Sequence, residues 1–196
     1  MKKKILIFGA TGSVGSSLTK LVKESSMDAH LIGKNEDEIS NLKDQTGFSY
    51  SIADVTDQNF IETIDKDLEG LEISGIAYCV GSIDLKPLNL VSKKDYLKSF
   101  ELNLFPIVEI IKKYKDNLKK NKSSVVLFST VAVKQGFPNH SIISPVKASL
   151  EGLTVSLAAE LAPNVRVNCI APSLSKSKMA GKILSNPKIA EGIAKQ

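Results

Sequence analysis

Short runs of apolar and β-branched residues alternate along the chain with longer stretches in which apolar residues recur at helical spacing. The short runs have few polar interruptions, which is typical of strands covered on both faces. They predict strands over 4–8, 29–32, 48–52, 73–80, 124–129 and 165–170, and the longer stretches predict helices over 13–25, 36–44, 57–69, 92–120 and 141–161. Because parallel strands need crossover connections, the alternation predicts an α/β fold in which a doubly wound parallel sheet carries helices on both faces.

Capping residues and prolines mark where some of these helices begin or break. Asp57 is placed to cap the third helix, and Ser92 with Asp95 resembles a capping box at the start of the fourth. Pro106 lies inside the fourth helix and predicts a kink or a break there. Ser144 precedes a proline, which is typical of an N-cap residue before a first-turn proline, here at the start of the last helix.

The composition is that of one globular domain. Of the 196 residues, 42% are hydrophobic and 24% are charged, which argues against a disordered tail or a fibre. No change in composition marks a second domain, so we expect residues 1–196 to form one unit. No run approaches the ~18 apolar residues of a membrane-spanning helix, and the apolar stretch 5–8 is too short for the core of a secretion signal. These features predict a soluble cytoplasmic protein without a membrane partner.

Charge and cysteine usage remove two further classes of site. The formal net charge is +5, but Arg166 is the only arginine, whereas base recognition depends on arginine and a clustered basic face. The densest lysine cluster, within 112–122, is typical of a solvated helix face, so we expect no nucleic-acid partner. Cys79 and Cys169 lie in apolar runs without C-x-x-C spacing, which predicts buried reduced thiols and no metal site.

The most specific motif is a glycine-rich turn between the first strand and the first helix, where three glycines stand at intervals of three. Glycine allows a tight turn and lets the backbone approach a pyrophosphate, which then meets the free N–H groups and the positive dipole end of the helix. In this strand–turn–helix context the motif predicts a nucleotide site in a Rossmann-like domain. The residues expected to form it are Gly9, Thr11, Gly12, Ser13, Val14 and Gly15.

The end of the second strand refines the identity of the nucleotide. Domains selective for NAD usually have an acid there, which binds the ribose hydroxyl groups. This chain has Lys34 at that place, and the first acid comes only at Glu36. Because an ammonium group attracts a ribose 2′-phosphate, we expect NADP(H) in preference to NAD(H).

Several segments resemble the short-chain dehydrogenase/reductase family, from the first strand to about Met179. The turn 9–15 looks like the glycine motif of that family, 54–57 is similar to its adenine-contacting Asp-Val pair, and 165–172 closely resembles its sixth strand and the proline beside nicotinamide. The resemblance implies interconversion of a small-molecule carbonyl and alcohol by hydride transfer. It also implies coenzyme contacts from Asp54, Val55, Val80, Gly81, Lys147, Pro172 and Ser177, and catalytic roles for Asn103, Thr130 and Lys147.

The resemblance fails at the proton donor. The family uses a Tyr-x-x-x-Lys pair, in which the lysine lowers the pKa of the phenol so that it can exchange a proton with the substrate near neutral pH. Four residues before Lys147 stands Ile143, which cannot transfer a proton.

Three interpretations of this loss remain open. In the first, His140 replaces the phenol, which requires a helix that begins early enough to bring it to the face of Ile143 and Lys147; otherwise it is an exposed loop histidine. In the second, hydride transfer continues while water, Thr130 or the substrate itself manages the proton. In the third, the protein is a non-catalytic dinucleotide-binding sensor or assembly protein.

The C-terminal part of the sequence carries expectations that rest on the resemblance alone. Ser177 stands where a threonine often contacts the coenzyme, and 174–184 is expected to belong to the lid over the substrate. Family members continue through another helix and a seventh strand, so we expect this edge of the sheet either to be truncated or to be closed differently. An uncovered edge strand favours pairing with another chain, and the resemblance implies a homodimer or homotetramer built through the helices 92–120 and 141–161.

Overall fold

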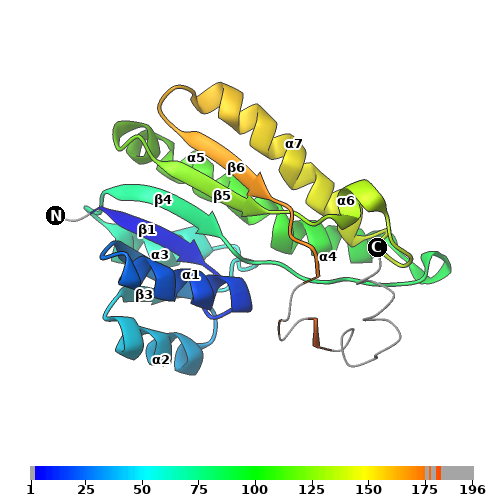
Figure 1. The fold of residues 1–196 in the computed structure, drawn as a ribbon, viewed down its shortest axis with the longest axis horizontal. Helices are drawn as coiled ribbons and strands as arrows, with labels where there is room; N and C mark the ends of the chain where they lie inside the picture. Colours follow the sequence, from blue (N-terminus) through cyan, green and yellow to red (C-terminus); the bar gives the residue numbers. More distant parts are fainter. Residues whose placement is uncertain (1–2, 175–176, 178–179, 182–196) are drawn as a thin grey trace.

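A computed structural model describes residues 3–174, 177 and 180–181. They form a six-stranded sheet with helices on both faces (Figure 1). The strands are β1 (Lys4–Phe8), β2 (Asp28–Gly33), β3 (Ser49–Ile52), β4 (Ile73–Tyr78), β5 (Ser124–Phe128) and β6 (Arg166–Ile170). The helices are α1 (Ser13–Glu24), α2 (Glu36–Thr46), α3 (Phe60–Leu68), α4 (Lys93–Asn103), α5 (Phe105–Lys120), α6 (Ala132–Gln135) and α7 (Ile143–Leu161), with a 3₁₀ turn η1 (Leu88–Leu90) before α4.

The strands are all parallel and lie in the order β3-β2-β1-β4-β5-β6, which confirms the predicted Rossmann-like doubly wound sheet. Because they are parallel, their carboxyl ends lie at one edge of the sheet. The winding direction reverses between β1 and β4, and in open sheets of this kind ligands bind at that point. The loops that follow the strands at this edge are therefore where a site is expected.

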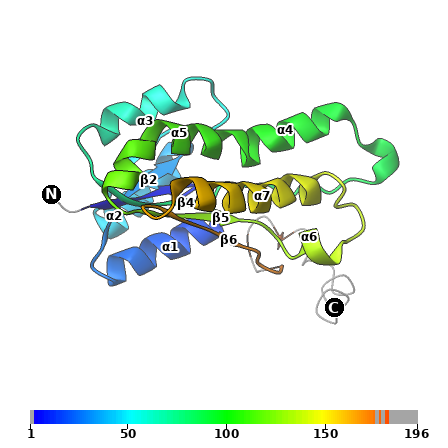
Figure 2. The same ribbon diagram turned by 90° about the horizontal axis from the view of Figure 1, so that it is seen from above.

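Helices cover the two faces of the sheet in separate layers (Figure 2). On one face, α1 and α2 pack around a small cluster that includes Ile7, Leu31 and Ile39. On the other face, α3, α5 and α7 enclose the main core. Of the helices in the described part of the chain, none is both long enough and apolar enough to span a bilayer.

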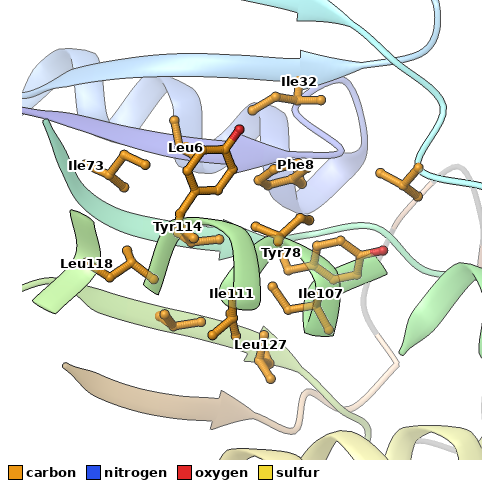
Figure 3. Packing of buried hydrophobic residues seen from close by; sticks show 14 of the residues in the cluster. Leu6, Phe8, Ile32, Ile73, Tyr78, Ile107, Ile111, Tyr114, Leu118 and Leu127 are labelled. Atoms are coloured by element: carbon orange, nitrogen blue, oxygen red, sulfur yellow. The ribbon is translucent and has the colours of Figure 1, made fainter. Parts of the chain in front are cut away.

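The main core fixes the strands that end beside the site. Figure 3 shows Ile107 and Ile111 of α5 packed near Tyr78 of β4 and Leu127 of β5, and all four are at most 3% exposed. Burying a side chain of this size stabilises a fold by roughly 1.5–3 kcal/mol. The carboxyl ends of β4 and β5 are therefore held by the main core.

A break between α4 and α5 confirms the effect expected of Pro106. α4 ends at Asn103, and Leu104, with φ −113°, links it to α5. Proline has no N–H group for the carbonyl of Leu102, four residues earlier. That oxygen instead accepts a hydrogen bond of 2.7 Å from the Tyr78 hydroxyl. The break thus ties the end of α4 to β4.

Other local predictions had mixed outcomes. The capping box of Ser92 and Asp95 is present. The prediction that Asp57 caps α3 is wrong: its N–H donates to the carbonyl of Asp54 in a turn, and the helix begins three residues later. Ser144 does not cap α7 either, because the helix already begins before it and its hydroxyl donates to the carbonyl of Ala132, in a helix that the sequence did not predict.

The two cysteines are free thiols, as expected, but both are only partly buried. The expectation that both thiols are buried is therefore wrong. Cys79 directly follows β4, and Cys169 lies near the end of β6.

A buried polar chain connects β2 and β3 to α3. His30, 1% exposed, has Nδ1 2.9 Å from the hydroxyl of Ser49 and Nε2 2.7 Å from that of Ser51. Ser51 donates onward to the Asp67 carboxylate at 2.6 Å. Burial lowers the pKa of His30 to about 4, and the Lys4 ammonium group acts in the same direction, while two nearby carboxylates oppose them.

We predict that acid destabilises the fold through His30. The unfolded chain takes up a proton there near pH 6.5 but the folded chain only near pH 4, so between these values the unfolded state binds more protons. The free energy of unfolding then falls by about 3 kcal/mol as the pH is lowered through this window. Urea unfolding across it measures the slope, which His30→Gln should remove, with His140→Gln as the control for the other histidine. An equal slope in wild type and His30→Gln contradicts the prediction.

Candidate functional site

The glycine turn brings α1 into backbone contact with the end of β1. Gly9 has φ +70°, a left-handed conformation that favours glycine. A Cβ on Gly15 would overlap the carbonyl oxygen of Gly9 and stand 2.8 Å from the Cα of Ala10, so no side chain fits there. A Cβ on Gly9 would stand 3.0 Å from the backbone nitrogen of Val80. The turn therefore lies directly against the end of β4, at the point where the winding direction reverses.

The first turn of α1 has the features of an anion site. The N-cap residue Gly12 is extended, no side chain caps the helix, and the first turn contains no acid. By contrast, α2 is capped by Asn35 and has three acidic residues in its first turn. Free N–H groups and the helix dipole attract a phosphate to an end such as that of α1. Thr11, Ser13 and Val14 flank this end, and the cradle as a whole fits the diphosphate of a dinucleotide.

Lys34 and Asp54 lie together beyond the ends of β2 and β3. The Lys34 Nζ is 3.2 Å from one Asp54 oxygen, and the other oxygen accepts hydrogen bonds from the N–H and hydroxyl groups of Thr56 at 3.0 and 2.8 Å. Partial burial raises the pKa of Asp54, but the hydrogen bonds from Thr56 and Lys34 outweigh it and lower the pKa overall. Val55, next to Asp54, is buried, so only its backbone faces this edge.

Gly81, Asn103 and Lys147 come together beyond the end of β4. A Cβ on Gly81 would stand 3.0 Å from the Lys147 Nζ and 3.2 Å from the Asn103 Oδ1. Asn103 is fully buried, and its Nδ2 donates to the carbonyl of Ser99 at 2.8 Å and to the hydroxyl of Ser82 at 3.3 Å. Its Oδ1 has no hydrogen-bond partner within the described structure. An unpartnered buried acceptor at this place fits a site completed by a ligand or water.

The Lys147 ammonium group is buried without a carboxylate partner. The residue is 7% exposed, and its Nζ donates to the carbonyl of Phe128, the last residue of β5, at 3.0 Å. Among the ion pairs of the described residues, none involves Lys147. Burial lowers the pKa of Lys147 to about 8, with a smaller opposing effect from Cys169.

Thr130 follows β5 at the same edge. Its hydroxyl oxygen accepts a hydrogen bond from the N–H of Ala132 at 3.3 Å, which leaves the hydroxyl proton available to a ligand. One turn before Lys147 on α7, Ile143 is 4% exposed, so an apolar side chain fills the place that the resemblance gives to a phenol.

His140 lies outside α7, which begins three residues later. Its Nδ1 is 2.8 Å from the carbonyl of Pro138, and its ring lies 5.4 Å from that of Phe137. The His140 ring is thus held by the loop before α7, while its carbonyl oxygen accepts a hydrogen bond of 2.9 Å from the N–H of Ser144 in the first turn of that helix.

The C-terminal candidates are placed only in part. Pro172 is exposed after β6, and its carbonyl accepts a hydrogen bond from the N–H of Val131 at 3.2 Å, so the end of β6 lies against the loop after β5. The Ser177 hydroxyl accepts a hydrogen bond from the N–H of Ala180 at 3.0 Å. Most of the segment 174–184, expected as a lid, lies outside the described residues.

Two polar contacts at this edge were not singled out from the sequence. The Ser82 hydroxyl donates to the Asp84 carboxylate at 2.6 Å, directly behind Asn103. The Ser129 hydroxyl donates to Glu151 on α7 at 2.6 Å. The Ser129–Glu151 pair joins segments that are distant in the sequence, and the Ser82–Asp84 pair lies within an irregular loop. The one sequence signal was that this loop begins directly after Gly81.

The comparisons with known proteins agree with this geometry. A family model described as enoyl-(acyl carrier protein) reductase matches residues 9–196. The chain belongs to the short-chain dehydrogenase/reductase family. This confirms, at the level of the family, the expectation of an NAD(P)-dependent oxidoreductase.

Individual relatives of the short-chain dehydrogenase/reductase family are distant. The chain is 28% identical to a chloroplastic tropinone reductase homolog of Arabidopsis thaliana, over 96% of this chain but only 62% of that protein. It is also 28% identical to a 3-oxoacyl-[acyl-carrier-protein] reductase of Rickettsia typhi, over 99% of this chain and 80% of that protein.

Solved structures of the family show the same fold. A 4-hydroxyisoleucine dehydrogenase complexed with NADH superposes with a TM-score of 0.87 at 21% identity, covering 97% of this chain and 81% of the other. The closed form of a serine dehydrogenase complexed with NADP⁺ superposes with a TM-score of 0.82 at 18% identity, covering 96% and 80%. The two coenzymes both occur among these neighbours, so the comparisons leave the choice between NAD and NADP open.

We predict that Gly15→Ala abolishes dinucleotide binding and lowers stability by about 1–3 kcal/mol, because the new methyl group displaces the backbone of the turn. Gly152→Ala on α7 is the matched control, since its Cβ would meet nothing within 4 Å. Thermal melting and quenching of reduced-coenzyme fluorescence measure the two effects. Wild-type coenzyme affinity in Gly15→Ala is the contrary result.

Proposed function

We propose that the protein interconverts a small-molecule carbonyl and its alcohol with NADP(H). The observation that carries the proposal is the convergence of an uncapped glycine cradle with Asn103, Thr130 and Lys147 at the carboxyl edge of β4 and β5. When bound, the nicotinamide ring supplies or accepts a hydride. The protein then has to hold a carbonyl beside that ring and manage one proton.

The residues at this edge divide these tasks. The amide groups at the start of α1 bind the diphosphate, and the turn at Gly9 sets its distance from β4. The hydroxyl proton of Thr130 is free to donate to a carbonyl oxygen. Lys147 presents a buried positive charge, which binds a ribose hydroxyl group as the resemblance implies. The irregular chain from Ser82 to η1 forms the side of the site where substrate choice is expected.

A non-catalytic dinucleotide-binding protein is the second candidate, and one observation favours it. Ile143 is buried where the family has its tyrosine, and losing a general acid typically lowers a rate by about 10²–10⁴-fold. The same fold supports both functions, because function resides in the site.

The two candidates differ in one measurement. We expect purified protein to oxidise NADPH only when a carbonyl compound is present, as followed by absorbance of the reduced coenzyme. The panel contains a 3-oxoacyl thioester and tropinone, the compounds that appear in the names of the two relatives described above. Gly15→Ala is the control that lacks coenzyme. Fluorescence quenching by NADPH without oxidation on any member of the panel favours the sensor.

We also infer a preference for NADP(H) that depends on Lys34. Its ammonium group is largely exposed at the edge where the second ribose lies in domains of this kind. Because Asp54 already engages it at 3.2 Å, the preference is expected to be modest.

Lys34→Ala is predicted to weaken NADPH binding about tenfold and to leave NADH binding unchanged, since only the 2′-phosphate loses a charged partner. Fluorescence titration with each coenzyme measures the two affinities. Lys20→Ala removes an exposed lysine of α1 and serves as the matched control. Tighter binding of NADH than of NADPH by the wild type would overturn the inference.

Assembly into a homodimer or homotetramer is proposed through α5 and α7. These helices form a groove with an apolar floor that includes Val108, Leu153 and Leu157 and charged residues such as Lys112 and Glu160. Val108 is 41% exposed, and an apolar face of this kind is typical of a protein–protein contact. The expected partner is a second copy of this chain.

A further inference from the structure

We propose that the Lys147 ammonium group is itself the proton donor to the substrate oxygen, in place of the missing phenol. The proposal rests on the function proposed above. In the family arrangement a lysine acts on the proton through the tyrosine one helical turn earlier, but here that place holds the buried apolar side chain of Ile143. The role of donor is therefore open to the next group on the same helix face that carries a transferable proton.

Lys147 lies where such a donor is needed. Its Nζ is held between the ends of β4 and β5, within 3.0 Å of where a Cβ on Gly81 would stand and 3.0 Å from the Phe128 carbonyl oxygen. An ammonium group has three donor hydrogens, and the Phe128 carbonyl takes one of them. Among the described residues the other two hydrogens have no acceptor, which leaves them available to a ligand, and Thr130, whose hydroxyl proton is also free, follows β5 at the same sheet edge.

Asn103 adds a second fixed polar group beside Gly81. Both hydrogens of its Nδ2 are engaged, one by the Ser99 carbonyl and one by the Ser82 hydroxyl, and Ser82 is in turn held by Asp84. These contacts fix the amide, and its Oδ1, which has no partner among the described residues, lies near Gly81, as the Lys147 Nζ does. An acceptor of this kind is available to a ligand or water that binds at this place.

Burial, and not a neighbouring charge, brings the ammonium group toward an acid that works near neutral pH. The Cys169 thiol on β6 opposes this effect, and Glu151, one turn later on α7, acts on that thiol. Glu151 is engaged by the Ser129 hydroxyl at 2.6 Å and lies 3.7 Å from Lys134. With no carboxylate paired to Lys147, burial lowers its pKa to about 8, whereas an ion-paired or exposed lysine holds its proton too tightly.

The proton balance of the step is simple. In the reducing direction the carbonyl carbon receives the hydride with its electron pair, and the carbonyl oxygen forms an O–H bond with a proton from the Lys147 Nζ as that N–H bond breaks. The lysine is left as a neutral amine and regains a proton from water. In the oxidising direction the neutral amine accepts the hydroxyl proton of the alcohol.

The test separates proton donation from coenzyme binding. Lys147→Ala is expected to lower kcat for carbonyl reduction by about 10²–10⁴-fold, and added methylamine or ethylamine should restore part of the rate in proportion to its protonated fraction. Lys147→Arg keeps the positive charge that a ribose attracts but cannot release a proton, so it should bind NADPH and remain slow. Lys119→Ala, on α5, is the matched control for loss of a lysine.

A second measurement needs neither coenzyme nor turnover. In the free wild-type protein, the pH dependence of acetylation at Lys147, read by mass spectrometry, should show half-maximal reactivity near pH 8, with Lys119 as the internal reference. If acetylation of Lys147 has the same pH dependence as acetylation of Lys119, the proposal is overturned. Because this measurement uses the wild type, it does not depend on whether a Lys147 variant folds.

The remaining outcomes distinguish this proposal from the function on which it rests. If the wild type reduces carbonyl compounds, either of two results overturns the proton donor alone. One is full activity of Lys147→Arg, and the other is a folded, coenzyme-binding Lys147→Ala that amines do not rescue. If His140→Ala loses carbonyl reduction while Lys147→Arg stays active, the proton donor is the histidine instead. Coenzyme binding without any carbonyl reduction by wild type overturns the proposed function and the donor together.

Discussion

The contact between the start of α1 and the end of β1 is the constraint on which the site depends. At Gly15 even a methyl group would overlap the carbonyl oxygen of Gly9, so the helix can approach the strand only because this position has no side chain. That approach directs the amide groups of α1 at the sheet edge where the winding direction reverses between β1 and β4. It also leaves the helix end uncapped, whereas α2 and α4 are capped by side chains. The uncapped helix start, which is the proposed phosphate site, and the close backbone contact thus occur in the same glycine-rich turn.

The electrostatics of the opposite half of the site follow from what surrounds Lys147. Its charge is buried and donates to the carbonyl oxygen of Phe128, which is a neutral acceptor. Neutral acceptors stabilise an ammonium group less than a carboxylate does, so the cost of burial is only partly offset. At the adenosine end the situation is reversed, because Lys34 is exposed and paired with Asp54. The two lysines are therefore in opposite states. Lys34 is exposed and paired with a carboxylate, whereas Lys147 is buried and has no carboxylate partner among the described residues.

Much of this architecture could be predicted because it depends on local sequence. The bounds of β1 were correct, the capping box of Ser92 is present, and Pro106 breaks its helix as expected, since each depends on residues within a few positions. Asp57 shows the limit of such reasoning: its residue type suits a cap, but a turn back to Asp54 delays the helix. His30 had no visible partner in the sequence, because the serines that bind it come from a strand about twenty residues later.

The site shows the same division between local and distant causes. The glycine turn could be read directly, and the structure brings Asn103, Thr130 and Lys147 to the carboxyl edge of β4 and β5, while their roles stay predictions. What the sequence did not show was the state of these groups: that Lys34 is engaged by Asp54, that the Asn103 amide is fixed by Ser82, and that the amine of Lys147 has no carboxylate partner among the described residues.

This last difference changes how the loss of the tyrosine is interpreted. From the sequence alone, Ile143 removes the only recognised acid and leaves a lysine that is normally too basic to replace it. In the folded protein Lys147 is buried, and burial lowers the pKa of its ammonium group toward neutral pH. The proposed proton donor therefore depends on a property of the folded state that the sequence does not display. A lost residue in a motif is evidence against activity only after its effect on the remaining groups has been considered.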